Sequence, residues 1–213
     1  MGERAAATES IAVRNPATGE EIARVPIDSA GDVAAAVARI RAAQPAWEEL
    51  GFAGRRAWLY RLRDWMLDNA DRIADTMKAE TGKVRAESTI EVPYLADQIN
   101  FYGARAAGML GERRVRPNSA LAATRKLRLR YRPYPVVGLI SPWNFPLVLS
   151  LGDAIPALMA GAAVAMKPSE VTPLGLNEIV DAWREEIGGP DVIAVVNGGA
   201  ETATALIDHS DFV

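Results

Sequence analysis

The 213-residue sequence contains no cysteine and only one histidine, His209. The absence of cysteine excludes disulfides, thiolate metal ligands and any cysteine nucleophile. A single histidine excludes a metal site with several histidine ligands, and a Ser–His–Asp triad would have to use His209. We therefore expect no metal site. We assign His209 no role beyond ending a helix, where a cation is favourable.

The sequence also lacks a strong excess of one charge and an unbroken apolar run long enough to span a bilayer. Lys and Arg total 24 and Asp and Glu total 27, which gives a formal charge of -3. Residues 133–166 contain only one charge, Asp153, but prolines and glycines interrupt them repeatedly. Residues 1–10 have charges of both signs and no apolar core, unlike a secretory signal. These features predict a cytoplasmic protein that binds neither nucleic acid nor membrane.

The composition, 49% hydrophobic and 24% charged, is that of a globular protein. Alternating apolar runs around a turn predict a hairpin over 11–27. Helical spacing follows from Ser29, a plausible N-cap, with a break expected at Pro45. Further helices are expected around 58–66, over 73–81 and over 86–110.

Residues 113–132 are locally basic, with eight Lys or Arg side chains and no acid. Their end alternates apolar and basic residues, which predicts a half-buried strand with a charged face. Such a face could bind nucleic acid or a partner. We favour a solvated face that guards a sheet edge.

From residue 136 onward, short apolar runs alternate with helical segments. The runs 136–140, 162–166 and 192–196 predict buried strands. Segments 147–160, 174–187 and 201–207 predict helices. The predicted fold is therefore α/β: N-terminal helices followed by a βαβαβ parallel sheet, a Rossmann-like half of a doubly wound fold. We divide the chain into a hairpin and helical part (1–112), a strand ribbon (113–134) and an incomplete nucleotide-binding part (135–213).

Ligands of such sheets bind at the carboxyl ends of the strands, so the residues after each strand are candidates for a site. Asn144 follows the first strand in a rigid loop with two prolines, where its amide could stabilise an oxyanion. An equally good interpretation is that Asn144 only holds the loop backbone. Gly198 and Gly199 follow the third strand and would let the backbone approach a ligand, although two glycines are also a common turn.

Lys167, Ser169 and Glu170 follow the second strand, at the position where dinucleotide folds hold the adenosine ribose. A ribose hydroxyl or a phosphate would provide the partner that a lysine at an uncharged strand end needs. Glu170 would accept ribose hydroxyls and repel a 2′-phosphate, which favours NAD, with NADP possible. The alternatives are an exposed Lys–Glu pair of little energetic weight or a Schiff-base lysine.

Several segments together resemble the aldehyde dehydrogenase superfamily, and the match runs from residue 11 to residue 213. They are NPATGEEIARV (15–25), ETGK (80–83), KLRLRYRPYPVVG (126–138), VVGLISPWNFPL (136–147), IPALMAGAAVAMKPSEVTPLG (155–175) and VVNGGAETATALIDHSDFV (195–213). The combination of PWNFP with KPSE at this spacing is highly specific.

The resemblance implies oxidation of aldehydes to acids with NAD or NADP. Asn144 matches the oxyanion-holding asparagine of the family. Lys167 and Glu170 match the residues that grip the adenosine ribose, and Gly198 and Gly199 match a glycine turn near the adenine and pyrophosphate. The nicotinamide side of the cleft would be lined by Ile140, Ser141, Pro142 and Trp143. The basic strand would belong to an oligomerisation ribbon, so a homo-oligomer is expected.

The resemblance also implies functional groups that this sequence does not contain. The catalytic cysteine, the general-base glutamate and a cofactor-binding Gly-Ser turn of the family lie in a region beyond residue 213. We therefore expect an aldehyde substrate only for a complete enzyme. The alternative to an enzyme portion is a catalytically inert module that binds NAD or mediates oligomerisation.

Overall fold

The computed structural model describes residues 9–119 and 122–213. The prediction for residues 1–10 therefore falls almost wholly outside the described part of the chain. Among the described residues, no helix combines the length and the apolar character needed to cross a membrane.

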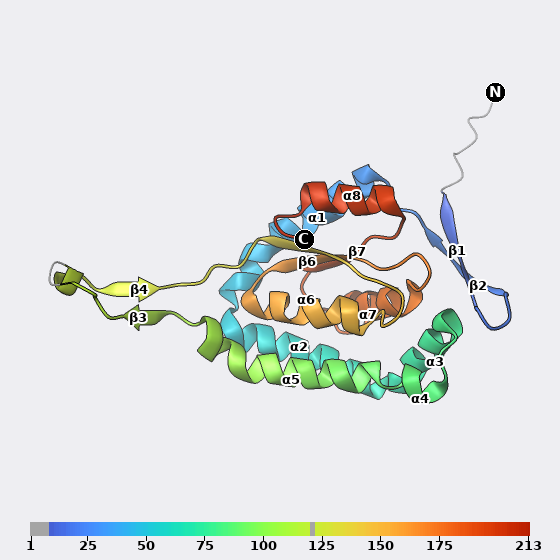
Figure 1. The fold of residues 1–213 in the computed structure, drawn as a ribbon, viewed down its shortest axis with the longest axis horizontal. Coiled ribbons are helices and arrows are strands. Elements are labelled where there is room, and N and C mark those ends of the chain that lie inside the picture. Colours follow the sequence, from blue (N-terminus) through green and yellow to red (C-terminus); the bar gives the residue numbers. More distant parts are fainter. Residues whose placement is uncertain (1–8, 120–121) are drawn as a thin grey trace, which may run out of the picture.

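A three-stranded parallel sheet lies at the centre of the molecule (Figure 1). Its strands β5 (Val136–Ile140), β6 (Ala163–Lys167) and β7 (Ile193–Val195) are hydrogen-bonded in that order. Every residue of β6 is buried, which explains its unbroken apolar sequence up to Lys167. The prediction of a parallel α/β sheet is confirmed, with one difference: Lys167 is the last residue of β6 and does not follow it.

Helices cover both faces of this sheet. Helices α6 (Val148–Ala160) and α7 (Leu174–Glu185) connect its strands and pack on one face. Helices α1 (Ala30–Glu49) and α8 (Ala200–His209) pack together on the other (Figure 1). The chain thus changes face after β7, which is the defining feature of a doubly wound fold.

Helix α8 returns the chain to the free side of β5. There Phe212 forms a parallel bridge with Val137, and the N–H of Gly138 donates to the Phe212 carbonyl at 2.7 Å. The spatial order is therefore Phe212, β5, β6, β7, and the direction of winding reverses at β5. In open α/β sheets, the crevice at such a reversal is where ligands bind.

A further layer of helices packs beneath α6. Helices α2 (Gly51–Asp68) and α5 (Glu91–Leu110) contact each other and α6, and α3 (Ala70–Thr81) contacts α7. One cluster of buried hydrophobic side chains extends from α1 through these helices to α8. The N-terminal helices therefore share their core with the sheet.

Two predictions about the continuity of helices are wrong, and proline explains one of them. The segment 86–110 is not one helix but α4 (Arg85–Ser88) followed by α5. Pro93 has no N–H to donate to the Thr89 carbonyl, so a continuous helix would lose that bond, whereas proline is tolerated in the first turn of α5.

The expected break at Pro45 is wrong, because α1 continues to Glu49. Tertiary contacts on both sides of the proline hold this part of the helix. The Gln44 amide donates to the Gly161 carbonyl at 2.8 Å, and the Trp47 indole donates to the Leu158 carbonyl at 2.9 Å. Both acceptor carbonyls lie at the C-terminal end of α6, so these bonds tie the second half of α1 to that helix end.

The predicted hairpin is present as β1 (Ser10–Arg14) and β2 (Glu21–Pro26). A second antiparallel pair, β3 (Arg113–Val115) and β4 (Leu127–Leu129), forms a ribbon that extends away from the body (Figure 1). The prediction of a half-buried strand is wrong here, since β4 has only three residues and Leu127 is 37% exposed. The ribbon projects away from any sheet or helix that could cover its apolar side.

The side of the sheet next to Phe212 exposes apolar surface. A groove of about 540 Å³ is lined by Tyr134, Val137, Leu139 and Phe212, among others. Exposed apolar grooves and unpaired sheet edges promote association. We expect the purified chain to associate as its concentration rises, measured by sedimentation velocity. A single monomeric boundary up to about 100 μM with a sharp cooperative melt would contradict this.

Candidate functional site

The carboxyl ends of all three parallel strands are hydrogen-bonded to one another at one edge of the sheet. The Ser141 N–H, directly after β5, donates to the Lys167 carbonyl at 3.1 Å. The Lys167 ammonium, at the end of β6, donates to the carbonyl of Gly198, beyond β7, at 2.6 Å. The segments that the sequence proposed as one site are therefore joined along the edge formed by the carboxyl ends of the strands, and β5, where the winding reverses, is part of that edge.

Asn144 lies in an exposed loop between β5 and α6, and neighbouring hydroxyls hold the base of this loop. The Ser150 hydroxyl lies 2.5 Å from both the Ser141 hydroxyl and the Pro146 carbonyl. Trp143 is 62% exposed and Asn144 is exposed as well. Within residues 9–119 and 122–213, no hydrogen bond of the Asn144 amide is found. The amide is thus available to a ligand, and the interpretation that it holds the loop backbone has no support.

Lys167 is only 4% exposed, and backbone carbonyls satisfy its charge. Besides Gly198, its ammonium donates to the Pro168 carbonyl at 2.8 Å, and it lies 3.5 Å from a Glu170 carboxylate oxygen. The contact of Lys167 with a ribose hydroxyl or a phosphate stays a prediction, because the fold already provides the partner that the buried ammonium needs. The sequence could not show that carbonyls of the adjoining loops would supply it.

Glu170 and Ser169 differ in what they can offer a ligand. The Glu170 side chain is 55% exposed beside the strand ends and can accept hydrogen bonds from outside the protein. Ser169 is buried, and its hydroxyl accepts the Val171 N–H at 3.3 Å. Ser169 thus shapes the loop that presents Glu170.

The two glycines after β7 have different surroundings. Gly198 adopts φ +157°, and a Cβ there would overlap the Thr202 hydroxyl. Gly199 is the N-cap of α8, and a Cβ there would have no atom within 4 Å. Gly198 is therefore required by packing, whereas Gly199 leaves open space at a helix N-terminus, the kind of position where backbone N–H groups meet an anion.

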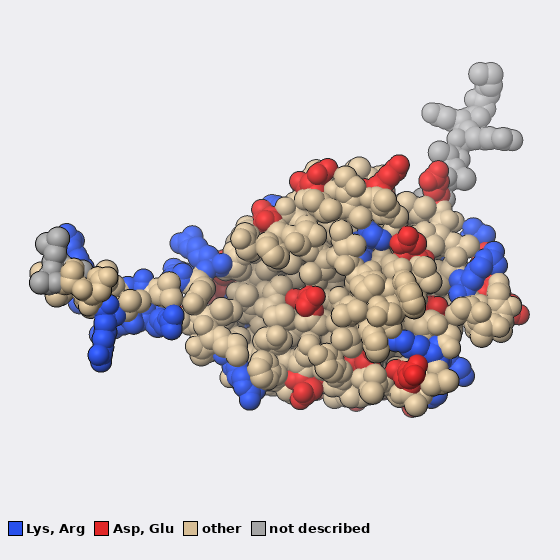
Figure 2. Space-filling model, in the orientation of Figure 1, with Lys and Arg blue, Asp and Glu red and all other residues tan. Residues whose placement is uncertain are grey.

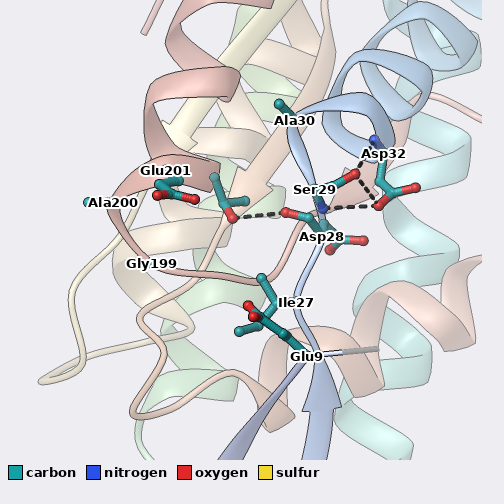
Figure 3. Close-up of a pocket in the computed structure, with 10 residues that line it drawn as sticks. Glu9, Ile27, Asp28, Ser29, Ala30, Asp32, Gly199, Ala200 and Glu201 are labelled. Carbon is teal, nitrogen blue, oxygen red and sulfur yellow. Dashed lines mark hydrogen bonds between the residues drawn. The ribbon is translucent and has the colours of Figure 1, made fainter. Parts of the chain in front are cut away.

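A cavity of about 530 Å³ lies beside Gly199, between the starts of α1 and α8 (Figure 3). Four acidic side chains line the cavity: Glu9, Asp28, Asp32 and Glu201. Of the site residues predicted from the sequence, only Gly199 lies there. Burial raises the pKa of Asp28, the Asn197 N–H opposes this, and the charge of Asp32 adds to it. So many carboxylates disfavour a phosphate-bearing ligand, and we do not assign the cavity to the cofactor.

Two buried carboxylates that bind the N-terminal ends of α6 and α7 were not predicted from the sequence. Glu80 accepts the Leu174 and Gly175 N–H groups at the start of α7, at 2.7 and 3.0 Å. Glu91 accepts the Leu147 and Val148 N–H groups at the start of α6, both at 3.0 Å. Burial raises the pKa of Glu80 to about 7, although these N–H groups lower it. The available signal was spacing: Glu80 continues the buried stripe of Ile73 and Met77, and Glu91 that of Leu95 and Ile99.

No group of three or more His, Asp or Glu side chains suitable for a metal ion occurs in the described part of the chain. What remains is a parallel sheet whose winding reverses at β5, with polar groups gathered at that reversal. These features define the class of the protein: a doubly wound α/β fold of the kind that binds nucleotides.

Comparison with known proteins identifies the family. Residues 3–213 match the aldehyde dehydrogenase family, and the chain belongs to that family. A Mycolicibacterium smegmatis protein named putative succinate-semialdehyde dehydrogenase [NADP(+)] is 38% identical over 97% of this chain and 40% of its own length. An N-succinylglutamate 5-semialdehyde dehydrogenase of Chromobacterium violaceum is 35% identical over 94% of this chain and 40% of its own.

A solved structure agrees. A protein of Anabaena variabilis, described as a putative aldehyde dehydrogenase, superimposes with a TM-score of 0.89 at 34% identity, covering 96% of this chain and 43% of that protein. This chain therefore spans about 40% of the length of the relatives it matches.

Proposed function

We propose that this chain forms the nicotinamide-dinucleotide side of an aldehyde dehydrogenase active site and supplies the Asn144 amide to the substrate oxyanion. One observation carries the proposal: Ser141, Lys167 and Gly198 join the carboxyl ends of the three strands along one edge of the sheet. Membership of the family supports the identity of the cofactor. When bound, the nicotinamide would accept a hydride from the substrate carbon.

The exposed groups at this edge are chemically suited to such a cofactor. The Glu170 carboxylate can accept two ribose hydroxyls, and the ammonium of Lys167 fixes its position from behind. Gly199 allows close approach at the start of α8. Ile140, Pro142 and Trp143, all exposed next to the Ser141 turn, offer apolar contacts for a nicotinamide ring.

Asn144 is the one residue of this chain that we assign to the chemistry. Its amide N–H group would donate to the oxygen of an aldehyde as that oxygen becomes negative. For the whole protein we propose oxidation of an aldehyde to an acid. The two relatives above are named for semialdehydes, and we extend to this protein only the aldehyde class. We expect the isolated chain, which has no cysteine, to form no NADH from a panel of aldehydes.

An alternative function is a catalytically inert module that binds NAD or mediates oligomerisation. The projecting β3–β4 ribbon favours it, because Val115 and Leu127 are paired across the two strands and both are exposed. We propose that this ribbon contacts a second copy in a cytoplasmic homo-oligomer.

Calorimetric titration with NAD⁺ and NADP⁺ tests the cofactor. We expect binding at millimolar concentration or tighter and a preference for NAD⁺, because Glu170 repels a 2′-phosphate. Glu170→Gln should reduce the preference by about tenfold, or about 1.4 kcal/mol. Glu185→Gln, at the exposed end of α7, is the matched control with the same change in charge. Absence of heat with both nucleotides at millimolar concentration would refute the proposed cofactor site.

A further inference from the structure

A buried ion pair links the N-terminal helices to the loop that carries Asn144. Lys83, just after α3, and Glu91, the first residue of α5, lie 2.9 Å apart. The Glu91 side chain is fully buried and that of Lys83 is 14% exposed. Burying two charges is costly unless they satisfy further groups, so the remaining contacts of this pair indicate what it does.

Glu91 holds the end of the loop. Its second carboxylate oxygen accepts the N–H groups of Leu147 and Val148, where the loop becomes α6. These N–H groups have no partner within the helix, and no side chain of the loop caps them. A carboxylate is also favoured there by the helix dipole. The direction in which the chain enters α6 is thus fixed from α5.

Lys83 holds the middle of the loop. Its ammonium lies 4.1 Å from the centre of the Phe145 ring, in the geometry of a cation–π contact. Phe145 directly follows Asn144, and the Pro146 carbonyl that comes next bonds to the Ser150 hydroxyl. The ion pair therefore contacts the residues on both sides of Pro146, and one of them, Phe145, is next to Asn144.

We propose that Lys83 and Glu91 are positioning residues for the Asn144 amide. The pair restricts the exposed loop and so limits the positions of the Asn144 amide, for which no hydrogen bond is found among the described residues. The loop-holding role stands on the contacts above. Its consequence for aldehyde chemistry rests on the proposed function of Asn144.

The test uses the full 213-residue chain at pH 7.5 and measures the loop directly by NMR. Hydrogen exchange is followed at the Leu147 and Val148 amides. The indole N–H signal of Trp143, assigned by its loss in Trp143→Phe, reports on the loop itself. The variants are Glu91→Gln, Lys83→Met and Lys83→Arg. Glu80→Gln is the matched control, because Glu80 caps α7 in the same way and, among the described residues, has no hydrogen bond or ion pair with the loop.

We expect Glu91→Gln to accelerate exchange at Leu147 and Val148 by at least tenfold, and both Glu91→Gln and Lys83→Met to shift or broaden the Trp143 signal. Lys83→Arg should restore the parent signal. Glu80→Gln should affect the Leu174 and Gly175 amides and leave the loop unchanged.

Exchange within twofold of the parent in Glu91→Gln, or equal loosening of the loop by Glu80→Gln, would overturn the proposal. If Glu91→Gln does not fold, as judged by circular dichroism, the contrast between Lys83→Met and Lys83→Arg decides the matter. Equal Trp143 signals in Lys83→Met and Lys83→Arg would then refute the proposed positioning role. Nucleotide titration of the same proteins is a separate readout, so loss of the cofactor site and loss of the loop contacts are told apart.

Discussion

Gly198→Ala is expected to destabilise the fold by about 3 kcal/mol or more, because the position has neither the space nor the backbone conformation for a side chain. A Cβ would overlap the Thr202 hydroxyl and lie 2.7 Å from the Thr202 Cβ, at φ +157°. Thr202 cannot easily move, since it is 2% exposed and its hydroxyl donates to the Asp28 carbonyl at 3.0 Å. Thermal unfolding should occur roughly 6–12 °C lower, given about 2–4 °C per kcal/mol for a chain of this size.

The neighbouring glycine provides the control. Gly199→Ala meets no atom within 4 Å, so only the poorer capping of α8 by alanine should count, about 1 kcal/mol or roughly 2–4 °C. Gly198→Ala combined with Thr202→Ala should recover part of the loss, because the overlapping hydroxyl is gone. Equal melting temperatures of Gly198→Ala and the parent would show that the turn after β7 adapts, which contradicts the packing argument.

The free energy of unfolding is expected to fall by about 3 kcal/mol between pH 4.5 and pH 7 because of Glu80 alone. Burial raises the pKa of this carboxyl from 4.5 to about 7 in the folded state. Over that interval the folded chain binds more protons than the unfolded chain, so stability decreases as the pH rises. The contribution of Glu80 to the free energy of unfolding is fully present below pH 4.5 and is lost as the pH rises through about 7.

Urea unfolding at several pH values measures this slope, and Glu80→Gln isolates it. Glutamine has nearly the same shape, can still accept an α7 N–H, and does not titrate. The difference in unfolding free energy between parent and variant should therefore change by about 3 kcal/mol across the interval. A constant difference would mean that Glu80 stays ionised in the fold, stabilised by the Leu174 and Gly175 N–H groups and the α7 dipole.

Local sequence signals predicted those parts of the fold that local forces determine. The strand 136–140 is found with those bounds because five apolar residues are bounded by a proline and a polar turn. Ser29 caps α1 through a reciprocal bond with Asp32, as its residue type indicated. The hairpin and the end of α3 at Gly82, which has φ +72°, likewise follow from turn chemistry.

The candidate site was predicted less completely, because its contacts join residues far apart in sequence. The polar residues after each strand were identified, since strand order places them at one edge. The Gly198 carbonyl beside Lys167, 31 residues away, could not be deduced from residue type. The same holds for the bond from Glu91 to Leu147, across 56 residues. Pro45 was misjudged for a related reason: contacts with the end of α6 outweigh a local helix breaker.

The charges of the chain are unevenly distributed between the basic ribbon and the rest of the molecule. Residues 113–132 carry eight positive charges and no negative one, so the remainder carries a net charge of -11. In Figure 2 the projecting ribbon shows blue side chains, whereas the body shows red and blue ones together. A chain with a pI near 5.4 should be retained only by anion exchangers at neutral pH. This one has a large dipole moment and should also adhere to cation exchangers and heparin-like polymers through one end, until salt shortens the reach of its field.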